Sequence, residues 1–540
     1  MFEFKKVEIK GEINLTDKRE NFDKDGVSFL KKGELKYNLK FDKEIFIKEV
    51  SLFLNIDEKV KLFRNGFQSW SPSFEIERDT KIKKPLLPFL KISYLDPKDS
   101  GIKDSYFLTY IKRDNTYHFL IPENYNLLVK FSLLKEGLKI TFEIGKSIRE
   151  VSLPKIKISS RFLWKGGKQK VYGWTSWYSY YRKISHQEIE KNINSIKTLP
   201  INLNYFQIDD GWEMSVGDWF ENNKFKGTLK KLADGINKNN VKAGIWMAPF
   251  VVEKRSEIFR KHREWILKDR KGRMKFAGFN PFWSGLFFPL DITREDVKDY
   301  ILGRIRYLRK LGFDLFKFDF LYSLFIPGRH KKDISRMELF YEGMRILKEG
   351  VEGGEILGCG APFILKEGLY DILRVGPDTK DSWRDWFLNL IGYEGETSAM
   401  NSLRNTLSRS FILSKFFLKD PDVIFLKPEK LTRIEMETLI ISNFFLSDII
   451  FFSDPLYKLN RNHFSLLFSL KQYEDFTLNE FQWDNQLFKF KGTVGNGSIS
   501  GFVNLGDRKV KIETKDLKEI LFKKDRDFLY PHETRVFVER

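Results

Sequence analysis

The chain has 540 residues, 42% of them hydrophobic, which is enough for two or three domains with sizeable cores. Its formal net charge is +20, but Lys and Arg are interspersed with Asp and Glu along the whole length, with no basic block and no nucleic-acid motif. We therefore expect a solvated basic surface and no nucleic-acid partner. The single cysteine, Cys359, excludes an intramolecular disulfide framework.

The sequence also limits the cellular location. The start, Met1-Phe-Glu-Phe-Lys-Lys, has no apolar signal core, and the longest apolar stretch, residues 444–452, is too short to cross a bilayer. We expect a cytoplasmic protein without a membrane partner, and its oligomeric state stays open. Abundant Lys and Glu, with one Cys and six His, are typical of a thermophilic protein.

Residues 1–165 are predicted to form an N-terminal β-sandwich. Leu138–Ile144 alternates apolar and polar residues with period two, as a half-buried strand does. Four further runs of this kind are separated by turn signals, and they span 34–41, 44–54, 106–113 and 116–122. Many short strands without helices favour a sandwich.

Residues 166–455 change to short apolar strands that alternate with helical patterns, which predicts a central (β/α)₈ TIM barrel. Three helix starts carry capping boxes, beginning at Ser185, Ser335 and Thr432. Eight strands are predicted at 171–174, 205–209, 243–248, 315–320, 356–360, 372–375, 423–426 and 449–453. Residues 456–540 return to strand patterns and are predicted to form a small C-terminal β-domain, so the fold class is multidomain α/β and all-β.

The predicted barrel strands end in carboxylates, and active sites of such barrels lie at the C-terminal ends of the strands. Glycoside cleavage needs an ionised carboxylate and a protonated one, which in retaining enzymes are ~5–5.5 Å apart. Asp319 is the candidate nucleophile, because Lys317 shares its strand face and an ammonium favours the ionised form. Asp378 follows a strand on a loop and is the candidate acid/base, and Arg374 nearby would hold a substrate hydroxyl or tune the charge.

Aromatic residues accompany these carboxylates at the strand ends. Trp174, Trp177, Tyr178 and Trp246 could be ordinary core residues, but beside carboxylates they indicate a platform on which the apolar face of a sugar stacks. Metal and nucleotide motifs are absent from the sequence, so we expect no cofactor and no metal.

The chain resembles the α-galactosidases of glycoside hydrolase family 36, in particular the short three-domain prokaryotic members. The motifs that carry the resemblance occur in family order, and they are Asn65-Gly-Phe-Gln-Ser-Trp70, Gly173-Trp-Thr-Ser-Trp-Tyr178, Phe206-Gln-Ile-Asp-Asp210, Gly217-Asp-Trp219, Gly244-Ile-Trp246, Phe316-Lys-Phe-Asp-Phe320 and Arg374-Val-Gly-Pro-Asp-Thr379. The resemblance implies release of terminal α-linked galactose by double displacement, with α-galactoside oligosaccharides as substrates.

Residue roles are implied by the same motifs. Asp319 would be the nucleophile and Asp378 the acid/base, while Asp209 and Asp210 would bind the O4 and O6 side of galactose. The remaining substrate-binding residues would be Lys317 and Arg374 at other ring hydroxyls, Trp177, Tyr178, Trp246 and Cys359 in the pocket wall, and Trp70, which would reach over from the N-terminal domain. The chain departs from larger members at Phe67 and at 358–362, which leaves the aglycone preference open.

Other activities remain open at this point. A galactosyl transferase of the raffinose-synthase type would use the same aspartates, and an α-N-acetylgalactosaminidase would differ around C2 of the sugar. A non-catalytic carbohydrate-binding protein is disfavoured by the presence of both catalytic aspartates.

Overall fold

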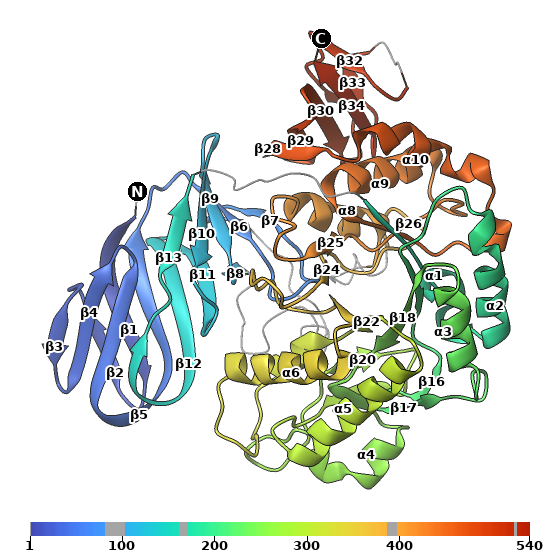
Figure 1. The fold of residues 1–540 in the computed structure, drawn as a ribbon. Helices are drawn as coiled ribbons and strands as arrows, with labels where there is room; N and C mark the ends of the chain where they lie inside the picture. The colour runs from blue at the N-terminus through green and yellow to red at the C-terminus, as the bar shows by residue number, and fades with distance from the viewer. Residues whose placement is uncertain (1, 81–102, 161–169, 386–396, 523–525, 540) are drawn as a thin grey trace.

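The computed structural model describes residues 2–80, 103–160, 170–385, 397–522 and 526–539. Figure 1 shows two antiparallel sheets at the N-terminus, a central parallel barrel and a small C-terminal sheet stacked on the barrel helices. The predicted first domain limit, at residue 165, lies outside the described residues, and the predicted domain limits stay predictions.

Two N-terminal sheets pack face to face. The larger sheet contains β1 (Glu3–Gly11), β2 (Asn14–Asp17), β3 (Phe22–Lys24), β4 (Val27–Gly33), β5 (Lys36–Asn55), β8 (Asp104–Tyr106), β11 (Leu128–Leu134) and β12 (Gly137–Ser152). The smaller sheet contains β6 (Lys61–Arg64), β7 (Phe74–Ile76), β9 (Thr109–Arg113), β10 (Thr116–Pro122) and β13 (Ile156–Ser159). Leu52 and Phe142 of the larger sheet share one buried cluster with Leu62 and Ile111 of the smaller sheet.

Two expectations about these strands were wrong. Residues 106–113 were expected as one strand but are divided at Phe107, with φ +66°, between β8 and β9 of different sheets. Residues 34–41 and 44–54 form a single long strand, β5, rather than two strands. The polar residues of 42–44 suggest a turn in the sequence, but the chain stays extended there, because β5 pairs with β12 along both halves, from Asn38 to Leu54. At 20 residues, β5 is long enough to pair with β1, β4 and β12.

The parallel barrel is closed. Its strand order is β25-β24-β23-β22-β18-β15-β14-β27-β26, and the first and last of these strands are adjacent in the chain. The strands are β14 (Val171–Thr175), β15 (Tyr205–Ile208), β18 (Lys242–Met247), β22 (Leu315–Phe318), β23 (Glu355–Gly358), β24 (Ile372–Arg374), β25 (Leu418–Asp420), β26 (Val423–Ile424) and β27 (Ile449–Phe452). All eight predicted strands have a counterpart, but the seventh, expected at 423–426, is only the two-residue β26. The strand β25, which lies before Pro421, was not expected; β25 pairs with β24 and β26 pairs with β27, so the two close the ring from both sides.

Helices cover the outside of the barrel, although not after every strand. They are α1 (Trp177–Tyr180), α2 (His186–Ser195), α3 (Leu229–Asn237), α4 (Glu257–Lys261), α5 (Glu295–Lys310), α6 (Arg336–Val351), α8 (Ala399–Ser408), α9 (Arg433–Leu446) and α10 (Ser465–Leu470). Residues 359–371, all described, connect β23 to β24 without a helix, which corrects the expectation of a helix after each strand.

The capping boxes are mostly confirmed. Those at Ser335 and Thr432 are complete. At Ser185 only the serine half forms, because the Glu188 carboxylate accepts a hydrogen bond from Lys191 instead.

An insertion follows the third strand and carries its own small sheet. The strands β19 (Val251–Glu253), β20 (Gly278–Asn280) and β21 (Gly285–Pro289) pair antiparallel at the C-terminal end of the barrel. The C-terminal sheet contains β28 (Thr477–Asp484), β29 (Leu487–Val494), β30 (Gly497–Asn504), β32 (Leu517–Glu519) and β34 (Thr534–Glu539). It packs on α9, where the Thr438 hydroxyl donates to the His532 carbonyl at 2.7 Å.

A buried arginine joins the N-terminal sheets to the barrel. Arg409, fully buried after α8, donates to the Asn65 side chain at 3.1 Å and to the carbonyls of Ser69, Val375 and Ser71 at 2.7–3.0 Å. Its guanidinium also lies 4.1 Å from the centre of the Phe363 ring. The loop of residues 65–73 is therefore fixed to the rim of the barrel.

Replacing Arg409 should destabilise the protein. Arg409→Met keeps much of the side-chain volume but leaves buried acceptors without donors, each at a cost of about 1–3 kcal/mol. We expect the apparent Tm to fall by at least ~3 °C by calorimetry. The control is Arg345→Met, because Arg345 is exposed on α6 and pairs with Glu342 and Glu349 of the same helix. Equal Tm values for the two variants would contradict the structural role of Arg409.

Candidate active site

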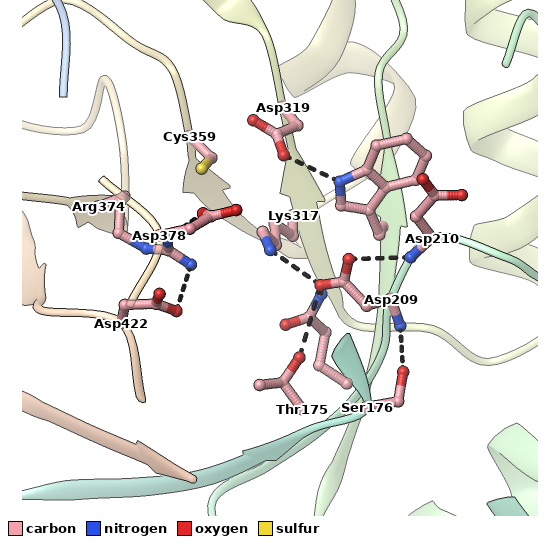
Figure 2. Close-up of polar contacts among 12 residues, drawn as sticks. Thr175, Ser176, Asp209, Asp210, Lys317, Asp319, Cys359, Arg374, Asp378 and Asp422 are labelled. Carbon is pink, nitrogen blue, oxygen red and sulfur yellow. Dashed lines mark hydrogen bonds and ion pairs between the residues drawn. The ribbon is translucent and has the colours of Figure 1, made fainter. Parts of the chain in front are cut away.

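The predicted site residues converge at the C-terminal end of the barrel. Eight of the eleven line one cavity that opens to solvent, and they are Trp70, Trp177, Asp209, Asp210, Trp246, Lys317, Asp319 and Asp378. The other three, Tyr178, Cys359 and Arg374, are packed behind this wall. Figure 2 shows the carboxylates and Lys317 around a common space.

Asp209 and Lys317 form a fixed ion pair. The Lys317 ammonium lies 2.8 Å from Asp209 Oδ2, which also accepts from the Gln207 amide at 2.8 Å. The other carboxylate oxygen accepts from the Asp210 amide N–H at 2.9 Å. Burial opposes the charge of Lys317, but the Asp209 carboxylate raises the pKa of Lys317 above its usual value, so the ammonium stays protonated.

Asp210 is held by two residues that the sequence did not single out. The Trp283 indole N–H donates to Asp210 Oδ2 at 2.9 Å, and Arg182 Nε lies 3.0 Å from Asp210 Oδ1. Burial raises the pKa of Asp210 well above its usual value, and the neighbouring Glu213 carboxylate adds to this effect against the opposing charge of Arg182.

Asp319 follows the fourth barrel strand and faces the cavity. The Trp246 indole N–H donates to Asp319 Oδ2 at 3.0 Å, and the Phe320 amide donates to Oδ1 at 2.8 Å. Burial nevertheless raises the pKa of Asp319, and the charge of Lys317 only opposes that rise. Lys317 favours the ionised form of Asp319, as expected, but its ammonium contacts Asp209 and burial has the larger effect on the pKa of Asp319.

Asp378 has a different environment. Its side chain is 38% exposed, whereas Asp319 is buried, and Arg374 Nη1 lies 3.0 Å from Asp378 Oδ1. The other guanidinium nitrogens of Arg374 pair with two further carboxylates, Asp420 at 3.3 Å and Asp422 at 2.8 Å. The two candidate catalytic carboxylates therefore differ in exposure and in charge partner, as two different roles require.

Asp422 links this group to Tyr178. The Tyr178 hydroxyl donates to Asp422 Oδ2, and burial raises the pKa of Asp422 to about 7 despite the opposing charge of Arg374. Three aspartates, Asp378, Asp420 and Asp422, therefore share one guanidinium. The predicted contact of Arg374 with a sugar hydroxyl stays a prediction, because its observed partners are carboxylates.

Trp70 reaches the cavity from the N-terminal loop. Its indole N–H donates to Cys359 Sγ at 3.3 Å, and its ring makes edge-to-face contacts with Phe320 and Tyr322. Gly360 beside it has φ +56°, and a Cβ there would lie 3.2 Å from the Trp70 ring and from the Phe320 backbone. Cys359 is buried, which raises the pKa of its thiol well above the usual range.

The residues missed by sequence reasoning lie between the predicted motifs. Arg182 follows the Gly173–Tyr178 motif by four residues, and Trp283 lies in the insertion after the third strand. Asp422 lies between β25 and β26, where the turn signal Asp420-Pro-Asp422 precedes the apolar Val423. No group of His, Cys, Asp or Glu among the described residues is arranged to hold a metal ion. None of the described helices is both long and apolar enough to cross a membrane.

Comparisons with known proteins agree with this geometry. A family model described as Melibiase matches residues 163–344. The α-galactosidase AgaA of Geobacillus stearothermophilus is 34% identical over 125 residues, a match that covers 22% of this chain and 16% of that protein. The sequence matches to the curated relatives thus span a small part of their length.

Solved structures resemble nearly the whole chain. The α-galactosidase TtGalA of Thermus thermophilus, solved with p-nitrophenyl α-D-galactopyranoside, superposes with a TM-score of 0.70 at 24% identity and covers 90% of this chain and 97% of that one. The GH36 α-galactosidase AgaA of Geobacillus stearothermophilus has a TM-score of 0.58 at 13% identity, with 95% and 80% covered. The chain resembles the GH36 α-galactosidases, and it shares their fold.

The buried thiol offers a test of the contact between Trp70 and Cys359. Because Cys359 is the single cysteine and its pKa is raised by burial, we expect its reaction with DTNB at pH 8 to be roughly 10²-fold slower in the folded protein than in the unfolded chain. Trp70→Ala removes its cover on the cavity side and should increase the folded-state rate severalfold. Phe220→Ala, at an exposed ring elsewhere, should leave the rate unchanged. Equal rates for all three proteins would contradict the position of Trp70.

Proposed function

We propose that the chain is a retaining α-galactosidase, which removes terminal α-linked galactose from oligosaccharides or galactosides by double displacement. The observation that supports this most directly is the pair of unlike carboxylates, Asp319 and Asp378, in one cavity with the Asp209–Lys317 ion pair. Relatives that the chain resembles in sequence and fold are named as α-galactosidases. We also propose that the protein is cytoplasmic and adapted to heat.

Asp319 is the nucleophile in this mechanism. Its two hydrogen-bond donors, Trp246 and the Phe320 amide, fix the carboxylate orientation and stabilise its ionised form. It attacks the anomeric carbon of the galactoside and forms a covalent glycosyl-enzyme ester, while the glycosidic bond breaks. The Asp209–Lys317 pair and Asp210 hold the sugar hydroxyls, and Trp70 excludes water from the cavity.

Asp378 is the acid/base. In the first step it gives its proton to the departing glycosidic oxygen, and in the second it takes a proton from the water that cleaves the ester. Its exposed position lets it reach both the leaving group and solvent. Once Asp378 is ionised, the adjacent Arg374 stabilises it, while the neighbouring carboxylates of Asp420 and Asp422 reduce the positive charge that Arg374 presents.

Removal of either carboxylate should abolish most turnover. We expect Asp319→Ala and Asp378→Ala to lower kcat/KM for p-nitrophenyl α-galactoside by ~10³-fold or more, on the order of 4 kcal/mol. Azide should rescue Asp319→Ala by forming β-galactosyl azide in the vacated space, and wild-type protein should release α-galactose first, as followed by NMR. Asp475→Ala, at an exposed position, is the control. Near-normal rates in both catalytic variants, or early β-galactose, would overturn the mechanism.

The hydrogen bond from Trp246 should set the acidic limit of activity. Trp246→Phe keeps the aromatic wall but removes a donor that stabilises ionised Asp319, so the pKa of Asp319 should rise further. Because the nucleophile acts when ionised, the acidic limb of kcat/KM should move to higher pH, by about one unit for a charged hydrogen bond worth about 1.5 kcal/mol.

The control for this experiment is Trp265→Phe, because the Trp265 indole donates to Asp296 rather than to a cavity residue. Its acidic limb should coincide with that of the wild type. If the acidic limb of kcat/KM in Trp246→Phe is unmoved or moves to lower pH, this hydrogen bond does not govern the ionisation of the nucleophile.

A further inference from the structure

Aromatic rings gather at the mouth of the cavity, beyond the buried carboxylates. Trp177, Phe279 and Phe282 line the opening, and Phe279 and Phe282 are 50% and 52% exposed. Large apolar rings at the surface of a ligand cavity are unfavourable in water unless something covers them during function. The deep part of the same cavity is polar and buried, so the two parts suit different chemical groups.

These rings and that of Tyr181 contact one another and form one surface. Phe282 stacks on Tyr181 with ring centres 5.8 Å apart and an interplanar angle of 12°. Trp177 meets both of these rings edge-on, at 5.1 Å and 5.8 Å. Tyr181 holds an unusual backbone conformation for a residue with a side chain, with φ +46° and ψ −148°. Such conformations persist mainly where function requires a particular placement.

This surface is tied to the sugar-binding carboxylates. Arg182 Nη1 donates to the Phe282 carbonyl at 3.0 Å, while Nε of the same guanidinium lies 3.0 Å from Asp210. Trp283, next to Phe282, donates to the other oxygen of Asp210. The mouth and the deep pocket are therefore positioned by one set of contacts.

The same surface lies near the candidate acid/base. Asp378 lines the cavity together with Phe282. Burial raises the pKa of Tyr181, and the nearby negative charge of Asp378 raises it further. A leaving group that receives its proton from Asp378 would therefore meet these rings as it departs.

We propose that Trp177, Phe279 and Phe282, with Tyr181 supporting Phe282, form the leaving-group subsite and stack on a ring with an apolar face, namely the pyranose that is released on cleavage. This inference rests on the proposed glycosidase function and adds to it the residues that contact the leaving group and set the aglycone preference. An aryl leaving group would use the same stacking chemistry, and the substrates below distinguish the two.

The test compares three leaving groups on one set of variants. kcat/KM is measured for melibiose, for p-nitrophenyl α-galactoside and for α-galactosyl fluoride, whose leaving group has no ring. Phe282→Ala should lower kcat/KM for melibiose by roughly five- to tenfold, the loss expected for one stacking contact, and should leave the fluoride within about twofold of wild type. Phe282→Trp, which keeps a ring, should restore most of the melibiose activity.

Phe220→Ala is the matched control, because Phe220 is 49% exposed and lies outside the cavity wall. It should leave all three substrates unchanged. Equal losses on all three substrates in Phe282→Ala, or an unchanged rate with melibiose, would overturn the subsite. A loss confined to the aryl substrate would overturn the assignment to a sugar ring. Failure of wild-type protein to hydrolyse the fluoride would instead refute the glycosidase function itself, and the fluoride rate also reports whether each variant is folded.

Discussion

The buried guanidinium of Arg409 is the contact on which the rest of the site depends. It has carbonyl and amide oxygens as acceptors from both the N-terminal loop and the sixth barrel strand end, and burial together with Arg64 lowers its pKa well below the usual value. A cation buried against neutral oxygens is costly, so this arrangement is retained only where its hydrogen bonds hold something in place. The Arg409 hydrogen bonds hold the loop that carries Trp70 to the cavity. Through this loop the β-rich N-terminal segment becomes part of the site at the barrel.

Each carboxylate of the site has a different charge environment. Asp209 pairs with Lys317, Asp210 lies between Glu213, which raises its pKa, and Arg182, which opposes that rise, and Asp378 shares Arg374 with Asp422. Asp319 is the buried carboxylate that combines an open face with two neutral donors. Such separation lets neighbouring acids of the same residue type act as sugar ligand, nucleophile and proton donor at one pH.

The sequence was sufficient to predict the barrel strands and most of the cavity wall, because strand ends converge in this fold wherever the helices lie. It could not predict the partners of these residues. The Asp210 contact with Trp283 and the Asp422 contact with Tyr178 join segments 73 and 244 residues apart, and no periodicity encodes such pairs. The placement of Lys317 against Asp209 rather than Asp319 depends on side-chain direction across neighbouring strands, which spacing within one strand does not determine. The long strand β5 was divided wrongly at its polar middle, because pairing with β12 on both sides of residues 41–44 keeps the chain extended there.

The most direct test of the proposed double displacement is to trap the glycosyl-enzyme ester. Incubation with a 5-fluoro-α-galactosyl fluoride slows breakdown of the ester more than its formation, and peptide mass spectrometry of the digested protein then locates the sugar. A single adduct on the peptide that contains Asp319, absent in Asp319→Ala, is the predicted result. An adduct on Asp378 or on another carboxylate, or substrate turnover without any covalent adduct, would contradict the assignment of Asp319 as the nucleophile.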